Sequence, residues 1–79
     1  MGFKDFELIL KDAEKRYNAK MKEYQEKWKG KSISQLADDL YVKEMIEKTA
    51  YNDPEERYKR LIDIVNQALM LASKLREKL

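Results

Sequence analysis

The stretch NDPEERYKRLIDIVNQALMLASKLREKL, residues 52–79, decides the fold. Asp53 has the position of a helix N-cap, Pro54 suits the first helical position, and two acidic residues follow in the first turn. Apolar side chains then recur every three or four residues: Tyr58, Leu61, Ile62, Val65, Ala68, Leu69, Ala72, Leu75 and Leu79. This spacing predicts a helix over residues 54–78 with one continuous apolar stripe.

Two earlier segments also have a helical pattern. The first, predicted over residues 4–29, carries an apolar or aromatic residue at every third or fourth position and precedes Gly30, which suits the position after a helix end. The second, predicted over residues 33–50, follows Ser32, which has the spacing of a capping box with Gln35. The chain of 79 residues has only two glycines and one proline, which favours long helices. We therefore expect an all-α chain with a single domain over residues 1–79.

Composition disfavours several classes of protein. The chain has no cysteine and no histidine, so disulfides, thiolate zinc sites and imidazole chemistry are excluded. Its formal net charge of +2 is small for a nucleic-acid-binding protein. The sequence has neither an apolar run near the roughly 20 residues of a membrane helix nor the apolar core of a signal peptide, so we expect a cytoplasmic protein without a membrane partner. The abundance of Lys, Glu and Tyr resembles that of proteins from hot habitats.

The short chain also favours association with itself. A domain of this size buries only a little more than about 60% of the surface that its unfolded chain exposes. Its stability is therefore marginal unless copies associate. We expect an oligomeric helical bundle, either a homodimer or a dimer of dimers.

Two acidic residues interrupt the apolar pattern of the second helix. At about 100° per residue, Glu44 and Glu47 are predicted at the centre of its apolar face. That face is formed by Ile33, Leu36, Ala37, Leu40 and Tyr51. Salt bridges to Lys or Arg of a neighbouring helix or subunit are one explanation of buried acids. A Mg²⁺ or Mn²⁺ site is the other, because carboxylates three residues apart on a helix converge on one ion, and Asp63 and Asn66 of the third helix could complete it.

A family resemblance supports the metal interpretation. The segment Glu44-Met45-Ile46-Glu47, followed after twelve residues by Arg60-Leu61-Ile62-Asp63, resembles the E-x-x-E…E-x-x-D signature of MazG-like nucleoside triphosphate pyrophosphohydrolases. Residues 61–71 are similar to the helix that carries the second acidic pair in that superfamily. Tyr24…Trp28 is similar to a Tyr…Trp element of its small members. The resemblance covers about residues 24–75 and implies an all-α domain that cleaves nucleoside triphosphates to monophosphates and pyrophosphate.

The resemblance also implies roles for individual residues. The catalytic residues would be Glu44, Glu47 and Asp63, which would hold Mg²⁺ or Mn²⁺ together with Asn66. The nucleotide would contact Tyr24, Trp28, Lys31 and Lys43. Arg60 departs from the family pattern, because it stands where the third glutamate is expected. Either Asp38 or Asp39 then takes over, or the chain is an inactive relative.

Two other functions are compatible with the sequence. The first is a helical homo-oligomeric interaction or structural protein without catalysis, in which the second and third helices form an antiparallel dimeric bundle. The second is a helix-turn-helix DNA-binding protein, because residues 32–43 resemble the start of that motif. Tyr41 and Glu47 stand where that motif usually has a small and an apolar residue, so DNA binding is the weaker alternative.

Overall fold

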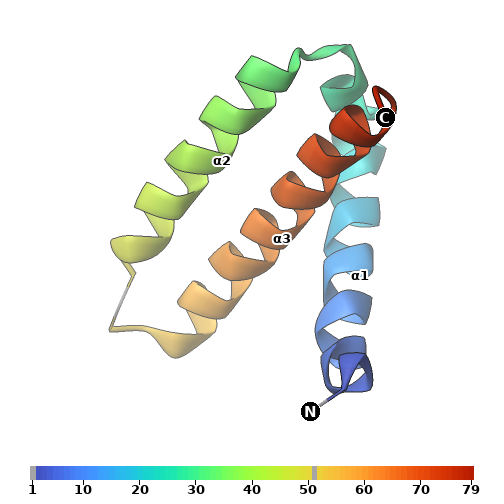
Figure 1. Cartoon of the computed structure of the whole chain (residues 1–79). Helices are drawn as coiled ribbons and strands as arrows, with labels where there is room; N and C mark the ends of the chain where they lie inside the picture. The colour runs from blue at the N-terminus through green and yellow to red at the C-terminus, as the bar shows by residue number, and fades with distance from the viewer. Residues whose placement is uncertain (1, 51) are drawn as a thin grey trace.

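Figure 1 shows the chain as a computed structural model that describes residues 2–50 and 52–79. The elements in chain order are η1 (Phe3–Phe6), α1 (Glu7–Tyr24), η2 (Lys27–Gly30), α2 (Ile33–Lys48) and α3 (Pro54–Arg76), where η denotes a 3₁₀ helix. No strand occurs among the described residues, so the all-α prediction with three main helices is confirmed. In the same part of the chain, none of the helices has the length and apolar character needed to cross a membrane.

The predicted caps of α2 and α3 are confirmed. The Ser32 hydroxyl accepts a hydrogen bond from the Gln35 backbone N–H at 3.1 Å, and the Gln35 side chain accepts one from the Ser32 N–H at 2.8 Å. Asp53 Oδ1 accepts from the Glu56 N–H at 3.1 Å, and Pro54 occupies the first turn of α3. Because these caps satisfy the free backbone donors, both helices begin at the predicted residue, and each ends within two residues of its predicted end.

The first helix is shorter than predicted. It ends five residues before the expected end at residue 29, because Gln25 and Glu26 adopt left-handed backbone with φ of 53° and 54°. This conformation costs a non-glycine residue roughly 1–2 kcal/mol. Glu26 accepts a hydrogen bond from the Tyr17 hydroxyl at 3.2 Å and pairs with Lys29 at 2.6 Å, contacts that hold the bend. The prediction that Gly30 marks the helix end was therefore wrong.

The helix α3 lies between α1 and α2 and contacts both (Figure 1). Two neighbouring amides of α3 reach toward different helices. Asn66 Nδ2 donates to the Ala13 carbonyl of α1 at 3.0 Å, and Gln67 Nε2 donates to the Leu36 carbonyl of α2 at 3.1 Å. Both amide side chains are buried. Directional hydrogen bonds thus join α3 to each of its neighbours.

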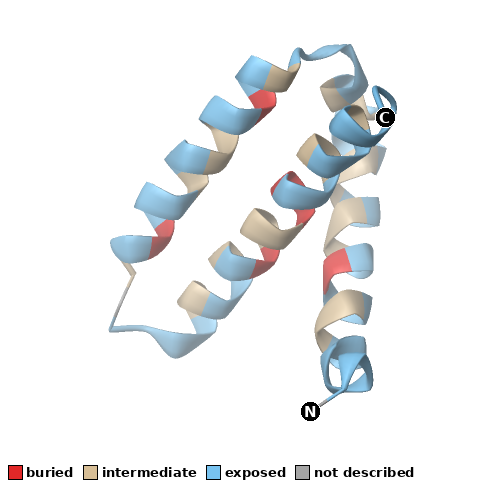
Figure 2. Ribbon diagram, in the orientation of Figure 1, coloured by how far each residue is buried: buried red, intermediate tan, exposed pale blue. Residues whose placement is uncertain are grey.

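The buried apolar core of the described residues is small. It consists of Ala13, Leu36 and Ile62, and in Figure 2 the buried positions lie where the helices face one another. The stripe predicted on α3 is largely in solvent, since Leu61, Leu69 and Leu75 are 44%, 55% and 45% exposed. On α2, Ala37 is exposed rather than on the buried face, and Tyr51 lies outside the described residues. The side of α3 that packs within the chain is therefore more polar than the side that faces solvent.

The folded chain exposes more surface than its mass predicts. A compact monomer of 9.5 kDa exposes about 5,000 Å², whereas this chain exposes 6407 Å². Its radius of gyration is 13.3 Å, against about 11.6 Å for a compact domain of the same length. The three helices thus form an open arrangement that leaves apolar surface uncovered.

Candidate functional site

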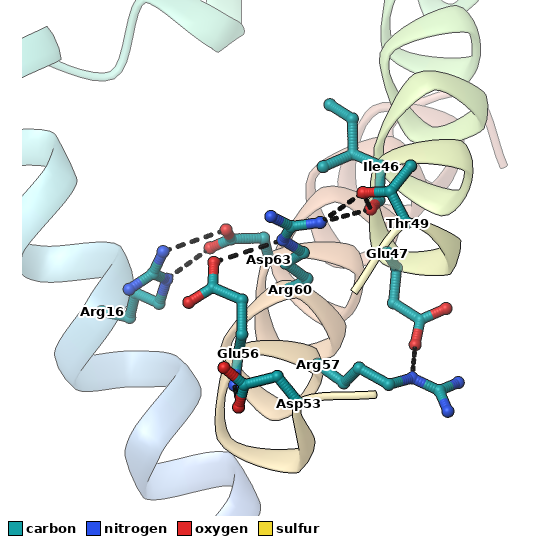
Figure 3. A network of polar contacts seen from close by, with 9 residues as sticks. All are labelled: Arg16, Ile46, Glu47, Thr49, Asp53, Glu56, Arg57, Arg60 and Asp63. Atoms are coloured by element: carbon teal, nitrogen blue, oxygen red, sulfur yellow. Dashed lines mark hydrogen bonds and ion pairs between the residues drawn. The ribbon is translucent and has the colours of Figure 1, made fainter. Parts of the chain in front are cut away.

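The two acids predicted at the centre of the α2 face differ in their surroundings. Glu47 is buried, with 7% of its surface exposed, and its Oε1 accepts a hydrogen bond from Arg57 Nε of α3 at 2.5 Å (Figure 3). The alternative of a salt bridge to a neighbouring helix is therefore confirmed for Glu47. Glu44 is exposed, so its predicted burial was wrong. It lies about 60° around the helix from Glu47, beyond the strip of α2 that α3 covers.

Asp63 belongs to a separate ion-pair cluster between α3 and α1. Arg16 donates from Nε and Nη2 to the two carboxylate oxygens at 2.5 and 3.1 Å, and Lys20 Nζ donates at 3.0 Å. Burial by itself would raise the pKa of Asp63, but the hydrogen bonds and charges of Arg16 and Lys20 outweigh it, and the pKa falls below its ordinary value. The ionised carboxylate is thus bound by two cations of the same chain.

Arg60, which stands where the resemblance expects a glutamate, fixes the C-terminal end of α2 to α3. Its Nη1 donates to the Ile46 carbonyl at 2.5 Å and to Thr49 Oγ1 at 2.7 Å, while its Nε donates to Glu56 at 3.2 Å (Figure 3). A cation at a helix C-terminus is stabilised by the helix dipole. The guanidinium therefore has a structural use in this fold.

The four predicted metal ligands are not brought together. Glu47 and Asp63 face cations on different neighbouring elements (Figure 3), Asn66 donates to a backbone carbonyl, and Glu44 lies in solvent. Within residues 2–50 and 52–79, no three Asp, Glu, His or Cys side chains are close enough to hold a metal ion. The catalytic metal site stays a prediction.

The four predicted substrate-binding residues are brought together only in part. Trp28 lines an open groove of about 420 Å³ between α1 and α3. Lys31 and Lys43 line a separate open cleft of about 290 Å³ beside α2. Lys31 pairs with Asp39 at 2.8 Å, and Tyr24 is 50% exposed. These side chains do not form one nucleotide-sized site within the single chain.

Sequence analysis missed the cations that neutralise the acids. The partner of Glu47 is Arg57, ten residues away, and the partner of Asp63 is Arg16, 47 residues away. Arg16 and Lys20 stand one helical turn apart, and this spacing was the available signal that α1 presents two cations to a neighbouring acid. Gln67, the other missed residue, carries no pattern that distinguishes a buried amide from a solvated one.

The Asp63 cluster predicts a pH-dependent contribution to stability. We expect Asp63→Asn to lower the free energy of unfolding by roughly 1–2 kcal/mol at pH 7, because the charge-assisted hydrogen bonds are lost. The lowered pKa of Asp63 means that its stabilisation is complete above the ordinary carboxyl pKa of 3.8 and is lost as the pH falls through the lower folded-state pKa. The difference between variant and wild type should therefore shrink below pH 3.8.

Urea unfolding at fixed protein concentration and several pH values measures this difference. Asp39→Asn is the control, because the Asp39–Lys31 pair is well exposed and should contribute little. If the free energy of unfolding of Asp63→Asn stays below that of the wild type by the same amount down to the most acidic pH, the stabilisation does not come from ionised Asp63.

Comparisons with known proteins give no further constraint on this arrangement. No protein-family model, no curated protein and no solved structure matches the chain. The resemblance to the MazG-like family accordingly stays a prediction, and function must be argued from the contacts and exposed surfaces.

Proposed function

We propose that this chain functions as a self-associating helical protein, in which a second copy covers the exposed apolar side of α3. The observation that carries the proposal is the orientation of α3, whose polar side is packed inside the chain and whose apolar side faces solvent. We call that apolar side the α3 seam. It consists of Tyr58, Leu61, Val65, Ala68, Ala72, Leu75 and Leu79, of which all but the half-buried Val65 are exposed.

The spacing of the α3 seam is that of a helix–helix interface. Its members are separated alternately by three and four residues from Tyr58 to Leu79. An average period of 3.5 residues keeps one seam facing a partner helix over the whole length of a coiled coil. Ala68 and Ala72 stand in the middle, where small side chains allow a second helix to approach closely. The pattern therefore favours another helix as the occupant.

Surface area favours a second copy of the chain as the source of that helix. The exposed surface exceeds that expected for a compact monomer by roughly 1,400 Å², and a standard interface takes about 800 Å² from each partner. A two-fold contact between identical chains uses the same patch on both, so one seam can cover the other. The net charge of +2 produces little repulsion between copies.

Sedimentation equilibrium and thermal unfolding test the proposal. We expect a molar mass of at least twice 9.5 kDa at micromolar concentration. We also expect a Tm that rises with protein concentration, because association stabilises only the folded state. A mass of 9.5 kDa at every concentration, together with a constant Tm, would refute self-association.

The other two functions receive less support from the described residues. The turn that a helix-turn-helix requires is missing, because α2 is continuous through Tyr41. The pyrophosphohydrolase activity stays a prediction from the resemblance, since Glu47 and Asp63 are each bound by cations of the chain. Its direct test is the formation of monophosphate and pyrophosphate from nucleoside triphosphates in the presence of Mg²⁺.

A further inference from the structure

The helix α2 has apolar side chains on two sides. One side packs on α3 through Leu36, which is 1% exposed. Four further apolar residues, which we call the α2 outer patch, lie about 80–180° around the helix from Leu36. They are Tyr41, Val42, Met45 and Ile46, with exposed fractions of 63%, 52%, 52% and 47%. Among the described residues, Gln67 of α3 borders this patch across an open cleft that Val42 and Ile46 line. A helix with two apolar sides is typical of a position between two layers of other helices.

The α2 outer patch has a symmetric pattern along the helix. Asp38, Val42, Met45 and Thr49 follow one another at steps of four, three and four residues, with the polar residues at the ends and the apolar ones in the middle. In an antiparallel pair of α2 helices centred between residues 43 and 44, Val42 lies opposite Met45 of the second copy. The same register sets Asp38 opposite Thr49, so a polar residue faces a polar residue at each end of the apolar contact. Apolar residues therefore meet apolar residues in the middle of the contact.

Antiparallel pairing is also favourable electrostatically. The dipoles of the two helices run in opposite directions, so that they oppose rather than reinforce each other. Lys48, in the last turn of one copy, would lie near Asp38, in the second turn of the other. The α2 outer patch is thus complementary to itself in the order of its apolar and polar residues and in charge.

The surface area of the chain leaves room for this second contact. Burial of one standard interface, about 800 Å² per chain, accounts for little more than half of the excess surface of roughly 1,400 Å². A second interface of ordinary size would account for the remainder. The smallest closed assembly with two different two-fold contacts is a tetramer.

We infer that α2 outer patches of two chains pair antiparallel and join two dimers, each held by the α3 seam, into a tetramer. The tetramer rests on the proposed self-association through α3, whereas the α2 contact is supported independently by the symmetry of its patch. The occupant of the α2 outer patch is accordingly a second copy of this chain.

Two single substitutions separate the two contacts. Met45→Glu puts a charge in the middle of the α2 outer patch, and Ala68→Glu puts one in the middle of the α3 seam, both at exposed positions of the single chain. Asn18→Glu is the matched control, because Asn18 is exposed among polar neighbours on α1. We expect a tetramer for the wild type and the control. We expect a dimer for Met45→Glu and for Ala68→Glu, and a monomer when the two substitutions are combined.

Sedimentation equilibrium distinguishes failure of the two proposals. A wild-type dimer whose mass Met45→Glu leaves unchanged would overturn the α2 contact and leave self-association through α3 standing. A mass that Ala68→Glu leaves unchanged would overturn the α3 seam. Circular dichroism of every variant confirms that its helices are retained, so that a change in mass reports on association rather than on unfolding.

Cysteine crosslinking tests the register without destabilising the helices. The chain has no cysteine, so Val42→Cys and Met45→Cys can be prepared separately and then mixed under mild oxidation. Antiparallel pairing predicts that the mixed disulfide, Cys at 42 to Cys at 45, is the main product. A dominant disulfide between two Val42→Cys chains, with no enrichment of the mixed product, would overturn the antiparallel register.

Discussion

Replacement of Ala68 by glutamate is expected to abolish the dimer that the α3 seam forms, with a loss of at least about a hundredfold in affinity, or roughly 3 kcal/mol. In the single chain Ala68 is exposed, so the new carboxylate is solvated and the helix is retained. In the dimer it would lie in the centre of an apolar interface without a partner, and two like charges would face each other across the two-fold contact. The effect should therefore appear in association rather than in helix content.

Sedimentation equilibrium over a range of concentrations measures this loss. Asn18→Glu adds the same charge on the solvated side of α1 and should leave the affinity unchanged, which controls for net charge. At low concentration, where all variants are dissociated, Ala68→Glu and wild type should unfold at the same temperature. An affinity of Ala68→Glu equal to that of the control would exclude the α3 seam as the interface.

The largest expected effect on the stability of the single chain comes from Arg57→Ala. Removal of the guanidinium leaves Glu47, which is 7% exposed, without its cation. Breaking a fully buried pair costs roughly 3–5 kcal/mol. Because Arg57 is 41% exposed and water can reach its position, we expect a loss of about 2 kcal/mol in the free energy of unfolding.

A double-mutant cycle isolates the pair. Glu47→Gln removes the buried charge, so the combination of Glu47→Gln with Arg57→Ala should cost less than the sum of the single changes, with a coupling of about 1 kcal/mol. Lys59→Ala removes an exposed cation of the same helix and is the control. Urea unfolding at matched concentration measures the four proteins of the cycle and the control, and additive losses would show that Glu47 does not depend on Arg57.

The starts of α2 and α3 were predictable, because side chains close in sequence satisfy the free backbone N–H groups there. Ser32 with Gln35, and Asp53 with Pro54, place the starts of α2 and α3 correctly, because a cap involves residues only three positions apart. The end of α1 was not predictable in this way. Gln25 and Glu26 are ordinary helical residues, and their left-handed backbone depends on contacts of one side chain.

The candidate site was predictable only in part. Periodicity identified Glu47 as a buried acid, because it follows from the winding of one helix. The positions of Arg16 and Arg57 opposite the acids depend on how helices pack, which a periodic pattern does not specify. The same limit applies to α3: its spacing predicts which side is apolar, but it does not determine whether that side is covered by the same chain or by another copy.

The neighbouring amides of Asn66 and Gln67 have a consequence for how this sequence can evolve. Each reaches a single carbonyl, one on α1 and one on α2, so a rotation of either helix about its axis would leave a buried amide without its partner. Leucine at either position would fill the same buried space, but it would permit several orientations of the neighbouring helix. Substitution of either amide would therefore relax the orientation of the helices, whereas exchange of one aliphatic side chain for another at an exposed position would not.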